Sequence, residues 1–311
     1  MSNLPNSQLM ADLTVQLPEA PLTTAQRRAR FFNSGNAFNI KLPPVPPASF
    51  NTHAALALDS DVSATFECDQ SGVLNCEMAA TTPLMLARYL SLATDDEQNL
   101  SAPASQLICF VITGTGYCRD DDEVWEWGPG DVLLLPGEGR VSLGADANGA
   151  LLWLGGNDPL LAFEKLRGSA ESIEPVHYTA AEIRRQLSLL ATLKSDANTS
   201  GTALIFSSET LEAERNITPS LTLSFNTLAP DCTQRAHRHN SAAITLIVQG
   251  DGCYSMIDKQ HCKWQQWTTM VTPPGSIHSH HNLGNETALF LIVQDGGLHY
   301  HARTMGFEFV E

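Results

Sequence analysis

The sequence predicts an all-β protein built from two successive barrels, with an arm before them and a helix between them. From about Thr82 onward, short β-type runs such as QLICFVITGTGYC and EVWEWGPGDVLLLPGEG are separated by turn residues at the spacing of an all-β domain. The second half repeats this layout with LTLSFNTLAP, AITLIVQGDGCYSMID, WTTMVTPPGS and ALFLIVQDGG. The best-aligned segments, VITGTGYC from Val111 and VQGDGCYS from Val248, indicate an internal duplication.

The length and composition indicate a folded protein of about two domains. The chain has 311 residues, of which 43% are hydrophobic and 17% are charged. It carries 18 basic and 34 acidic residues, which gives a net charge of −16. Because this charge repels polyanions, the sequence argues against nucleic acid and anionic membranes as partners.

The cysteines and the N-terminal segment favour a reducing, cytoplasmic location. The seven cysteines are an odd number in a chain too long to need disulfide staples, and no two of them are spaced as CxxC. The segment MSNLPNSQLMADLTVQLPEAP lacks the basic and apolar regions of a signal peptide, and no apolar run reaches the length of a membrane span. We therefore expect a cytoplasmic protein that is not bound to a membrane.

Residues 1–60 are expected to form an N-terminal arm. The segment TTAQRRARFF from Thr23 favours a short helix capped by a threonine, and the proline-rich KLPPVPPASF from Lys41 cannot continue it. Such an arm either packs on its own barrel or a neighbouring subunit, or stays a partly ordered tail.

The rest of the chain is expected to divide into an N-terminal barrel over 61–170, a linking helix within 171–200 and a C-terminal barrel over 201–311. The helix is indicated by TAAEIRRQLSLLATLK, in which Thr179 and Glu182 form a capping box ahead of an apolar stripe with helical spacing. We expect this stripe to pack against the barrels rather than to contact a cofactor.

Histidines gather at the ends of two runs in the second half. In RAHRHNSAAITLIVQG, His237 and His239 are one residue apart, so in a strand they lie on the same face. In TPPGSIHSHHN, His278 follows the turn residues Pro273–Gly275, and such a turn is able to direct a side chain back across a small barrel. Three neutral imidazoles that converge from two strands predict a metal site at His237, His239 and His278.

These two segments resemble the two motifs of the cupin superfamily, whose members are double-stranded β-helix, or jelly-roll, barrels. HRH with Ala243 and Gly250 resembles the first motif, and PPG with His278 and Asn282 resembles the second. In most metal cupins the position of Ala243 is a glutamate that serves as the fourth ligand. Loss of this glutamate with HRH retained, followed by TPP and H-x-H-x-N, resembles the gentisate 1,2-dioxygenase group, which includes salicylate and hydroxynaphthoate dioxygenases.

The resemblance implies roles for several further residues. His280 matches a histidine that hydrogen-bonds the substrate or the developing oxyanion, and Asn226 stands where the group has an active-site glutamine. Thr245 stands where the relatives have an arginine that binds the substrate carboxylate. Arg303 is a weak candidate to replace that arginine, and Trp267, in place of the glycine that usually begins the second motif, is a weak candidate for a substrate contact.

The N-terminal barrel is expected to be free of metal. That group carries its metal in the first of its two barrels, whereas here Ser101, Ala102 and Pro103 stand where its HxH motif is expected. The second motif is also degraded, since GDVLLLPGEGR ends near Arg140 rather than at a histidine.

The resemblance implies an Fe(II)-dependent dioxygenase that cleaves the ring of a hydroxylated aromatic acid, or acts on a related chelating oxyacid, in aromatic compound catabolism. Its partners are then a small anionic substrate and O₂, and such proteins often form homo-oligomers. Two alternatives stay open. One is a non-oxidative metal-cupin enzyme, an isomerase, lyase or decarboxylase that uses Zn, Ni or Mn, since three histidines accept all of these metals. The other is a metal-dependent protein that binds a small ligand without turnover.

Overall fold

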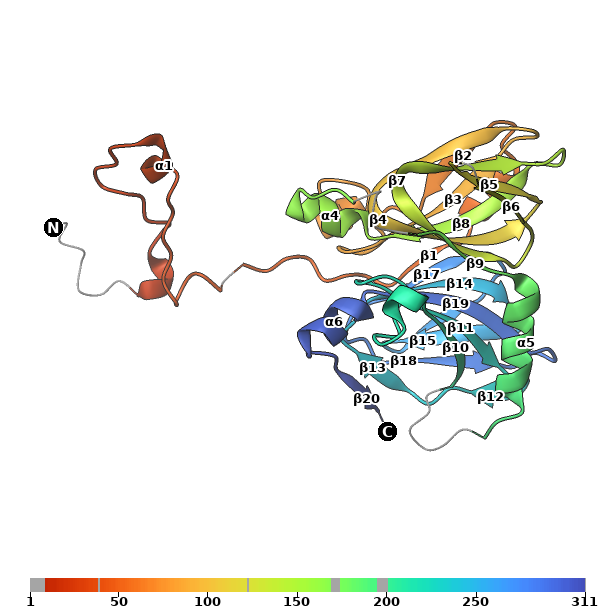
Figure 1. Ribbon diagram of the computed structural model, residues 1–311. Helices are drawn as coiled ribbons and strands as arrows, with labels where there is room; N and C mark the ends of the chain where they lie inside the picture. The colour runs from red at the N-terminus through yellow and green to blue at the C-terminus, as the bar shows by residue number, and fades with distance from the viewer. Residues whose placement is uncertain (1–8, 39, 122, 169–173, 195–200, 311) are drawn as a thin grey trace. The chain divides into compact units, whose positions relative to one another are not determined.

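The computed structural model describes residues 9–38, 40–121, 123–168, 174–194 and 201–310 (Figure 1). The chain divides into two compact units, Met1–Pro43 and Pro44–Glu311. The first unit contains the short helices η1 (Met10–Asp12) and α1 (Thr24–Arg27). The predicted capped helix forms, because the Thr23 side chain accepts a hydrogen bond from the backbone of Gln26 and the Gln26 side chain accepts one from Thr23.

The N-terminal barrel of the second unit is built on one antiparallel sheet. Its strands run in the order β2-β3-β8-β4-β7-β5-β6, and β9 pairs with β7. The strands are β2 (Ala64–Glu67), β3 (Leu86–Leu92), β4 (Glu97–Thr113), β5 (Gly116–Asp120), β6 (Glu123–Trp127), β7 (Val132–Ala145), β8 (Ala150–Gly156) and β9 (Val176–Tyr178).

The C-terminal barrel consists of two antiparallel sheets. One runs in the order β1-β17-β14-β19-β11-β10, and the other runs β16-β15-β18-β13-β20 with β12 paired to β18. The first contains β1 (Ala48–Phe50), β10 (Thr202–Phe206), β11 (Thr222–Leu228), β14 (Ala243–Gln249), β17 (Thr269–Thr272) and β19 (Ala288–Gln294). The second contains β12 (Cys232–Thr233), β13 (His237–His239), β15 (Cys253–Ile257), β16 (Gln260–Lys263), β18 (His278–Asn282) and β20 (Phe307–Phe309).

The two barrels pair their strands in the same way. In the first, β4 lies between β7 and β8, and in the second, β14 lies between β17 and β19. Each of these central strands ends in a Gly-x-Gly segment that leads to the next strand, and Gly114 and Gly252 adopt positive φ angles of 85° and 74° there. This common topology is what an internal duplication predicts, and the all-β, two-barrel fold is confirmed.

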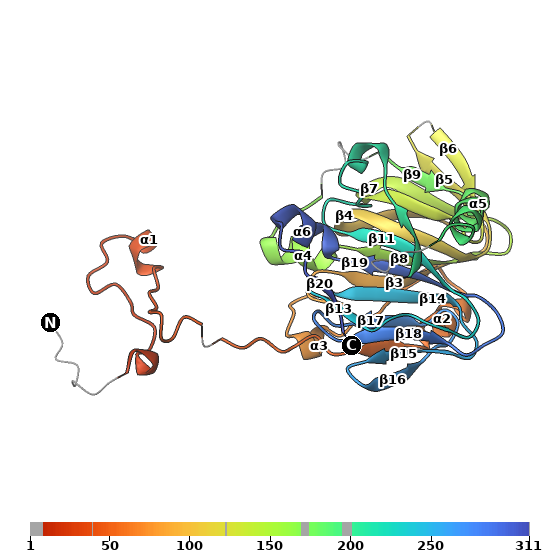
Figure 2. The ribbon, with the colours of Figure 1, turned by 90° about the horizontal axis from the view of Figure 1, so that it is seen from below.

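The barrels pack against each other through a shared apolar core, and Figure 1 shows the orange-to-green barrel lying against the cyan-to-blue one. In Figure 2, which is seen from below, the two barrels overlap. Because side chains alternate along a strand, Ile108 and Phe110 of β4 enter this shared core while Leu107 and Cys109 enter the interior of the N-terminal barrel. In β14, Ile244 likewise faces the shared core.

The sheets are accompanied by short helices: α2 (His53–Leu58), α3 (Ser71–Leu74), α4 (Asp158–Glu164), α5 (Ala180–Ala191), η3 (Glu209–Leu211) and α6 (Gly296–Ala302). The predicted linking helix is α5, and its Thr179 cap accepts a hydrogen bond from the Glu182 backbone. The second half of the predicted capping box does not form, because the Glu182 carboxylate accepts hydrogen bonds from Arg185 and Gln186. Residues 171–173 and 195–200 of the predicted linker lie outside the described residues.

The structure differs from the expected arm at its C-terminal end. Strand β1, which lies inside the 1–60 segment, pairs with β17 and so adds an edge strand to the C-terminal barrel. Helix α2 follows it and buries Ala54 and Ala57 in the shared core. A search of the described helices finds none with the length and apolar character of a membrane-spanning segment.

Candidate metal centre

Strand β13 brings two histidines to one face, as the HRH pattern predicts. His237 and His239 are buried, with 5% and 6% of their surface exposed, while Arg238 between them is exposed. Arg238 faces away from the histidines and forms an ion pair with Glu308 of β20. The period of two along the strand therefore separates two inward imidazoles from an outward guanidinium.

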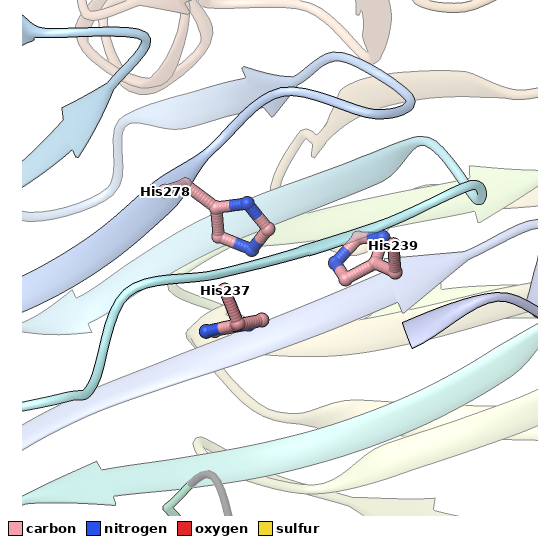
Figure 3. A group of neighbouring side chains, drawn as sticks. All are labelled: His237, His239 and His278. Atoms are coloured by element: carbon pink, nitrogen blue, oxygen red, sulfur yellow. The ribbon is translucent and has the colours of Figure 1, made fainter. Parts of the chain in front are cut away.

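His278 joins them from β18, the neighbouring strand. It lies opposite His237 in the strand register, and its ring centroid is 4.2 Å from that of His237 and 4.8 Å from that of His239 (Figure 3). The predicted turn before it is tied to β13, because the backbone N–H of Gly275 donates to the carbonyl of His239 over 2.7 Å. Gly275 has a positive φ of 76°, which glycine adopts without strain.

Hydrogen bonds set the same tautomer in all three rings. The Nδ1 atoms of His237, His239 and His278 each lie 2.9 Å from a backbone carbonyl oxygen, those of Arg235, Ser241 and Ser276 respectively. A carbonyl oxygen only accepts, so each Nδ1 carries the proton and donates it. Each Nε2 therefore keeps its lone pair, which is the form that binds a metal ion while the other nitrogen is held by an outer partner.

The donor set fits a metal ion. One nitrogen from each ring lies within 4.8 Å of the other two. In a facial set with metal–nitrogen bonds of about 2.1 Å, neighbouring nitrogens lie roughly 3 Å apart, so a small movement of the rings closes the set around an ion. Within the described part of the chain, this is the one group of three histidine, cysteine or acidic side chains gathered in this way. Three neutral imidazoles leave the charge of a divalent ion unbalanced, and a facial set leaves open positions for other ligands.

Burial keeps the rings neutral at physiological pH. It lowers the pKa of His239 to about 4, and it lowers the pKa of His278 to about 2 with the help of the neighbouring imidazoles. The pKa of His237 is also lowered by burial. Metal binding requires the neutral imidazole, so these rings do not have to release a proton to bind an ion at pH 7.

The position of the missing glutamate lies beside a glutamine. Ala243 is opposite Gln294 in the register of β14 and β19. The Gln294 side-chain Nε2 lies 3.4 Å from His239 Nε2, and its Oε1 lies 3.4 Å from Ser241 Oγ. A neutral amide thus occupies the space next to the ligands where a carboxylate side chain from position 243 would enter.

The three histidines line a cavity of about 620 Å³ inside the C-terminal barrel. Its wall on the sheet that contains β14 includes alternate residues of three strands: Ser224, Asn226, Ala243, Thr245, Ile292 and Gln294. Their chain neighbours face the shared core instead, as Phe225, Ile244 and Val293 do. The same alternation in the N-terminal barrel gives a packed apolar interior, with Ala102 inside it and Ser101 and Pro103 exposed.

Three of the five further predicted residues line this cavity. Asn226 is buried, and its amide donates to Ser224 Oγ over 2.8 Å. Thr245 is 3% exposed and lines the wall opposite the histidines, and His280 is 4% exposed beside His278. Burial lowers the pKa of His280 to about 3.

Trp267 and Arg303 lie elsewhere. Trp267 lies two residues before β17, has a left-handed backbone with a φ of 62°, and packs against the shared core with its ring 6.2 Å from that of Phe110. Arg303 ends helix α6, is exposed, and donates a hydrogen bond to the carbonyl of His301. Neither lines the cavity, so neither is placed for a substrate contact in this structure.

Other cavity residues were not predicted from the sequence: Arg215, Gln234, Gln294, Tyr300 and Phe307. Gln294 follows the alternation of ALFLIVQ, so the strand pattern contained a signal for it. Arg215 lies in the loop before β11, and Tyr300 lies on the short helix α6, so local patterns gave no signal for them.

Comparisons with known proteins agree with this architecture. Residues 224–294 match the family model of the cupin domain. A gentisate 1,2-dioxygenase of a Ralstonia species is 34% identical over 79 residues, which are 25% of this chain and 22% of that protein. A gentisate 1,2-dioxygenase of a Streptomyces species is 27% identical over 74 residues, or 24% and 21% of the two chains. The matched segment thus spans about a fifth of the length of these curated relatives.

Solved structures match over much more of the chain. The salicylate 1,2-dioxygenase of Pseudoaminobacter salicylatoxidans, as adducts with gentisate, superimposes with a TM-score of 0.72 at 15% identity over 88% of this chain and 87% of its own. An oxalate decarboxylase of Bacillus subtilis gives a TM-score of 0.51 at 14% identity over 75% and 73% of the two chains. This chain therefore has the two-barrel cupin fold, matches the cupin domain model over residues 224–294, and resembles gentisate 1,2-dioxygenases over about a quarter of its length.

Proposed function

We propose that this chain is an Fe(II)-dependent dioxygenase that cleaves the ring of a hydroxylated aromatic acid of the gentisate or salicylate type, or oxidises a related chelating oxyacid. The observation that carries the proposal is the set of three buried, neutral imidazoles with unprotonated Nε2 atoms on the wall of a 620 Å³ cavity. The similarity of about a quarter of the chain to gentisate 1,2-dioxygenases supports it.

A ferrous ion held by His237, His239 and His278 supplies a 2+ centre with open positions, which favours an anionic, chelating substrate and O₂ together. The chain supplies the rest of the site. Its cavity lies within the range of about 300–1,000 Å³ typical of small-ligand sites. Buried Asn226 and Thr245 offer polar groups for the hydroxyl and carboxylate oxygens, while Ile292 offers apolar surface for the ring.

We propose that Arg215 takes the place of the carboxylate-binding arginine that Thr245 replaces. Among the described residues that line the cavity, Arg215 is the one arginine and the neighbouring Glu214 is the one acidic residue. No ion pair joins Arg215 to another described residue, so its guanidinium is available to a substrate carboxylate, to which it forms charge-assisted and bidentate hydrogen bonds. This assignment replaces Arg303, which does not line the cavity.

The N-terminal barrel is proposed to be a structural, metal-free domain. Its interior is filled by apolar side chains from every major strand of its sheet, including Leu107, Leu133 and Leu152. Such packing leaves little space for an ion or a ligand. Its outer face supports the catalytic barrel through the shared core.

The protein is further proposed to act as a homo-oligomer in the reducing cytoplasm. All seven cysteines are free, which suits a reducing compartment. In the first unit, large apolar side chains are exposed, among them Leu9 at 68%, Leu22 at 87% and Phe38 at 86%. Apolar surface of this extent favours burial against another chain, and a second copy is the partner we propose.

Metal analysis joined to oxygen uptake tests the proposal. Protein purified without oxygen is analysed for metal, reconstituted with Fe(II), and presented with gentisate, salicylate and hydroxynaphthoates in an oxygen electrode. We expect iron-dependent O₂ uptake with at least one of these acids, and its loss in His239→Ala. Turnover without O₂ uptake, or with Zn, Ni or Mn alone, would instead assign an isomerase, lyase or decarboxylase. Saturable binding without any product would assign a binding protein.

A further inference from the structure

A fourth histidine stands beside the metal ligands but is held differently. His280 follows His278 on β18, lines the same cavity, and has its ring centroid 6.1 Å from that of His278. Its Nδ1 lies 2.8 Å from the hydroxyl oxygen of Ser255, which is its register partner on β15. The indole Nε1 of Trp264 lies 2.8 Å from the same hydroxyl oxygen. These three side chains are buried, at 4%, 1% and 3% exposure.

The direction of the hydrogen bonds follows from the donors available. An indole N–H only donates, so Trp264 gives its hydrogen to Ser255 Oγ. The Ser255 hydroxyl must then donate its own hydrogen to an acceptor, and its other hydrogen-bond partner among the described residues is His280 Nδ1. If His280 Nδ1 carried the proton instead, the Ser255 hydroxyl would hold two incoming donors and a buried hydrogen without an acceptor, which is a costly arrangement.

We propose that Trp264 and Ser255 are positioning residues that fix His280 in the Nε2–H tautomer, the reverse of the tautomer in His237, His239 and His278. In the three ligands, backbone carbonyls accept from Nδ1 and leave Nε2 as a lone pair. In His280, a hydroxyl donates to Nδ1 and leaves Nε2 as a donor. The tautomer keeps His280 from becoming a fourth metal ligand through Nε2.

The same tautomer makes His280 a hydrogen-bond donor in the cavity. Its Nε2 has no hydrogen-bond partner among the described residues, and it is not one of their fully buried, unpartnered polar atoms. The ring lines the cavity, so this nitrogen is accessible to a bound molecule. An N–H there is a donor to an oxygen anion of the molecule that binds beside the three ligands. This functional part rests on the proposed function, whereas the tautomer itself does not.

Packing holds the indole in place. The Trp264 ring lies 4.9 Å from that of Phe290 and 5.6 Å from that of His280. A Cβ added to Gly250 would lie 2.5 Å from Cε3 of Trp264, so glycine at this position leaves the room that the indole occupies. The glycine that completes the first cupin-like motif thereby contributes to the orientation of His280.

The tautomer is measured by nitrogen NMR. The full chain is labelled with ¹⁵N-histidine, loaded with Zn(II) as a diamagnetic probe, and examined by two-bond ¹H–¹⁵N correlation, which distinguishes protonated from unprotonated ring nitrogens. We expect a protonated Nε2 and an unprotonated Nδ1 for His280, and a protonated Nδ1 for His237, His239 and His278. A protonated Nδ1 in wild-type His280 would overturn the inference.

Substitutions test whether Ser255 and Trp264 set the tautomer of His280. In Ser255→Ala the His280 Nδ1 resonance is expected to move toward the protonated position, and Ser255→Thr, which keeps the hydroxyl, is expected to restore it. Trp264→Phe removes the donor that occupies Ser255 and is expected to give a mixture of both tautomers. Ser241→Ala is the matched control, since His239 keeps its bond to the Ser241 carbonyl and its tautomer. An unchanged His280 spectrum in both Ser255→Ala and Trp264→Phe would contradict the assignment.

Oxygen uptake is scored separately, so the two proposals fail in different ways. In the iron-loaded enzyme, Ser255→Ala is expected to lose roughly tenfold in kcat, the size expected for one charge-assisted hydrogen bond, with recovery in Ser255→Thr. An Nε2–H tautomer in a protein that consumes no O₂ upholds this inference and refutes the proposed function. O₂ uptake by a protein in which His280 is protonated on Nδ1 upholds the proposed function and refutes this inference.

Discussion

Substitution of Arg215 by glycine is expected to raise the stability of the fold and to weaken substrate binding. Its backbone has a φ of 58°, in the left-handed region that residues other than glycine occupy only with strain, and it lines the cavity. Arg215→Gly removes both the strain and the guanidinium. Arg303→Gly is a matched control, because Arg303 has a φ of 60°, is exposed, and does not line the cavity.

The expected magnitudes follow from these positions. Relief of a left-handed backbone is worth about 1–2 kcal/mol, and the added entropy of glycine in the unfolded chain costs about 0.4–1 kcal/mol. The difference between these two ranges is about 0–1.6 kcal/mol, so the free energy of unfolding is expected to rise by about 0.8 kcal/mol in both variants. Arg215 is exposed to solvent before binding, so we take the low end of a charge-assisted hydrogen bond, about 1.4 kcal/mol, which corresponds to about a tenfold loss of affinity for a carboxylate in Arg215→Gly.

Two assays separate the effects. Urea unfolding gives the change in stability, and calorimetry with gentisate on zinc-loaded protein gives the dissociation constant without any need for turnover. The expected pattern is higher stability in both variants and weaker gentisate binding in Arg215→Gly alone. If Arg215→Gly binds gentisate as tightly as Arg303→Gly does, the role assigned to Arg215 is wrong.

Further predictions concern the ligand set, a buried carboxyl group and the shared core. Ala243→Glu places a carboxylate beside the three histidines, and we expect tighter metal binding but at least about a tenfold loss of turnover, because the added charge and ligand disfavour a chelating anion; unchanged turnover would contradict this. Burial raises the pKa of Asp295 from 3.8 to about 6, so folding is disfavoured as pH rises from about 4 through 6. Asp295→Asn is therefore expected to be more stable by up to about 3 kcal/mol at pH 7.5, with the difference vanishing near pH 4; equal urea midpoints at both pH values would refute the cause. The buried Tyr89 hydroxyl contacts Thr269 Oγ1 and the Trp267 carbonyl across the two barrels. Tyr89→Phe is expected to cost about 1–3 kcal/mol in urea unfolding, and a cost near zero would show that these contacts do not couple the barrels.

The parts of the site that the sequence predicted are those fixed by local geometry. The period of two in HRH separates His237 and His239 from Arg238, and the Pro-Pro-Gly turn determines where His278 begins its strand. Both patterns hold wherever the strand is placed in the barrel. The tautomers were not predicted, although they are also set locally, since each ligand bonds to a carbonyl two residues away in its own segment.

The parts that were missed depend on contacts between distant segments. Trp267 lies within a tight turn, and only the packing of one barrel on the other shows that it faces Phe110 rather than the cavity. Arg303 follows helix α6, which ends at Ala302, and this position leaves it exposed and away from the cavity. Arg215 belongs to a loop whose course is set by tertiary contacts, and Ser255 reaches His280 only through strand pairing.

The most direct test of the account is isotopic. The iron-loaded protein is supplied with ¹⁸O₂ and with the hydroxylated aromatic acid that gives the fastest oxygen uptake, and the product is analysed by mass spectrometry. The account predicts that both oxygen atoms of one O₂ molecule enter one molecule of ring-opened product, and that His239→Ala forms none. A product formed at the same rate without ¹⁸O would contradict the account and assign the three-histidine site to non-oxidative chemistry.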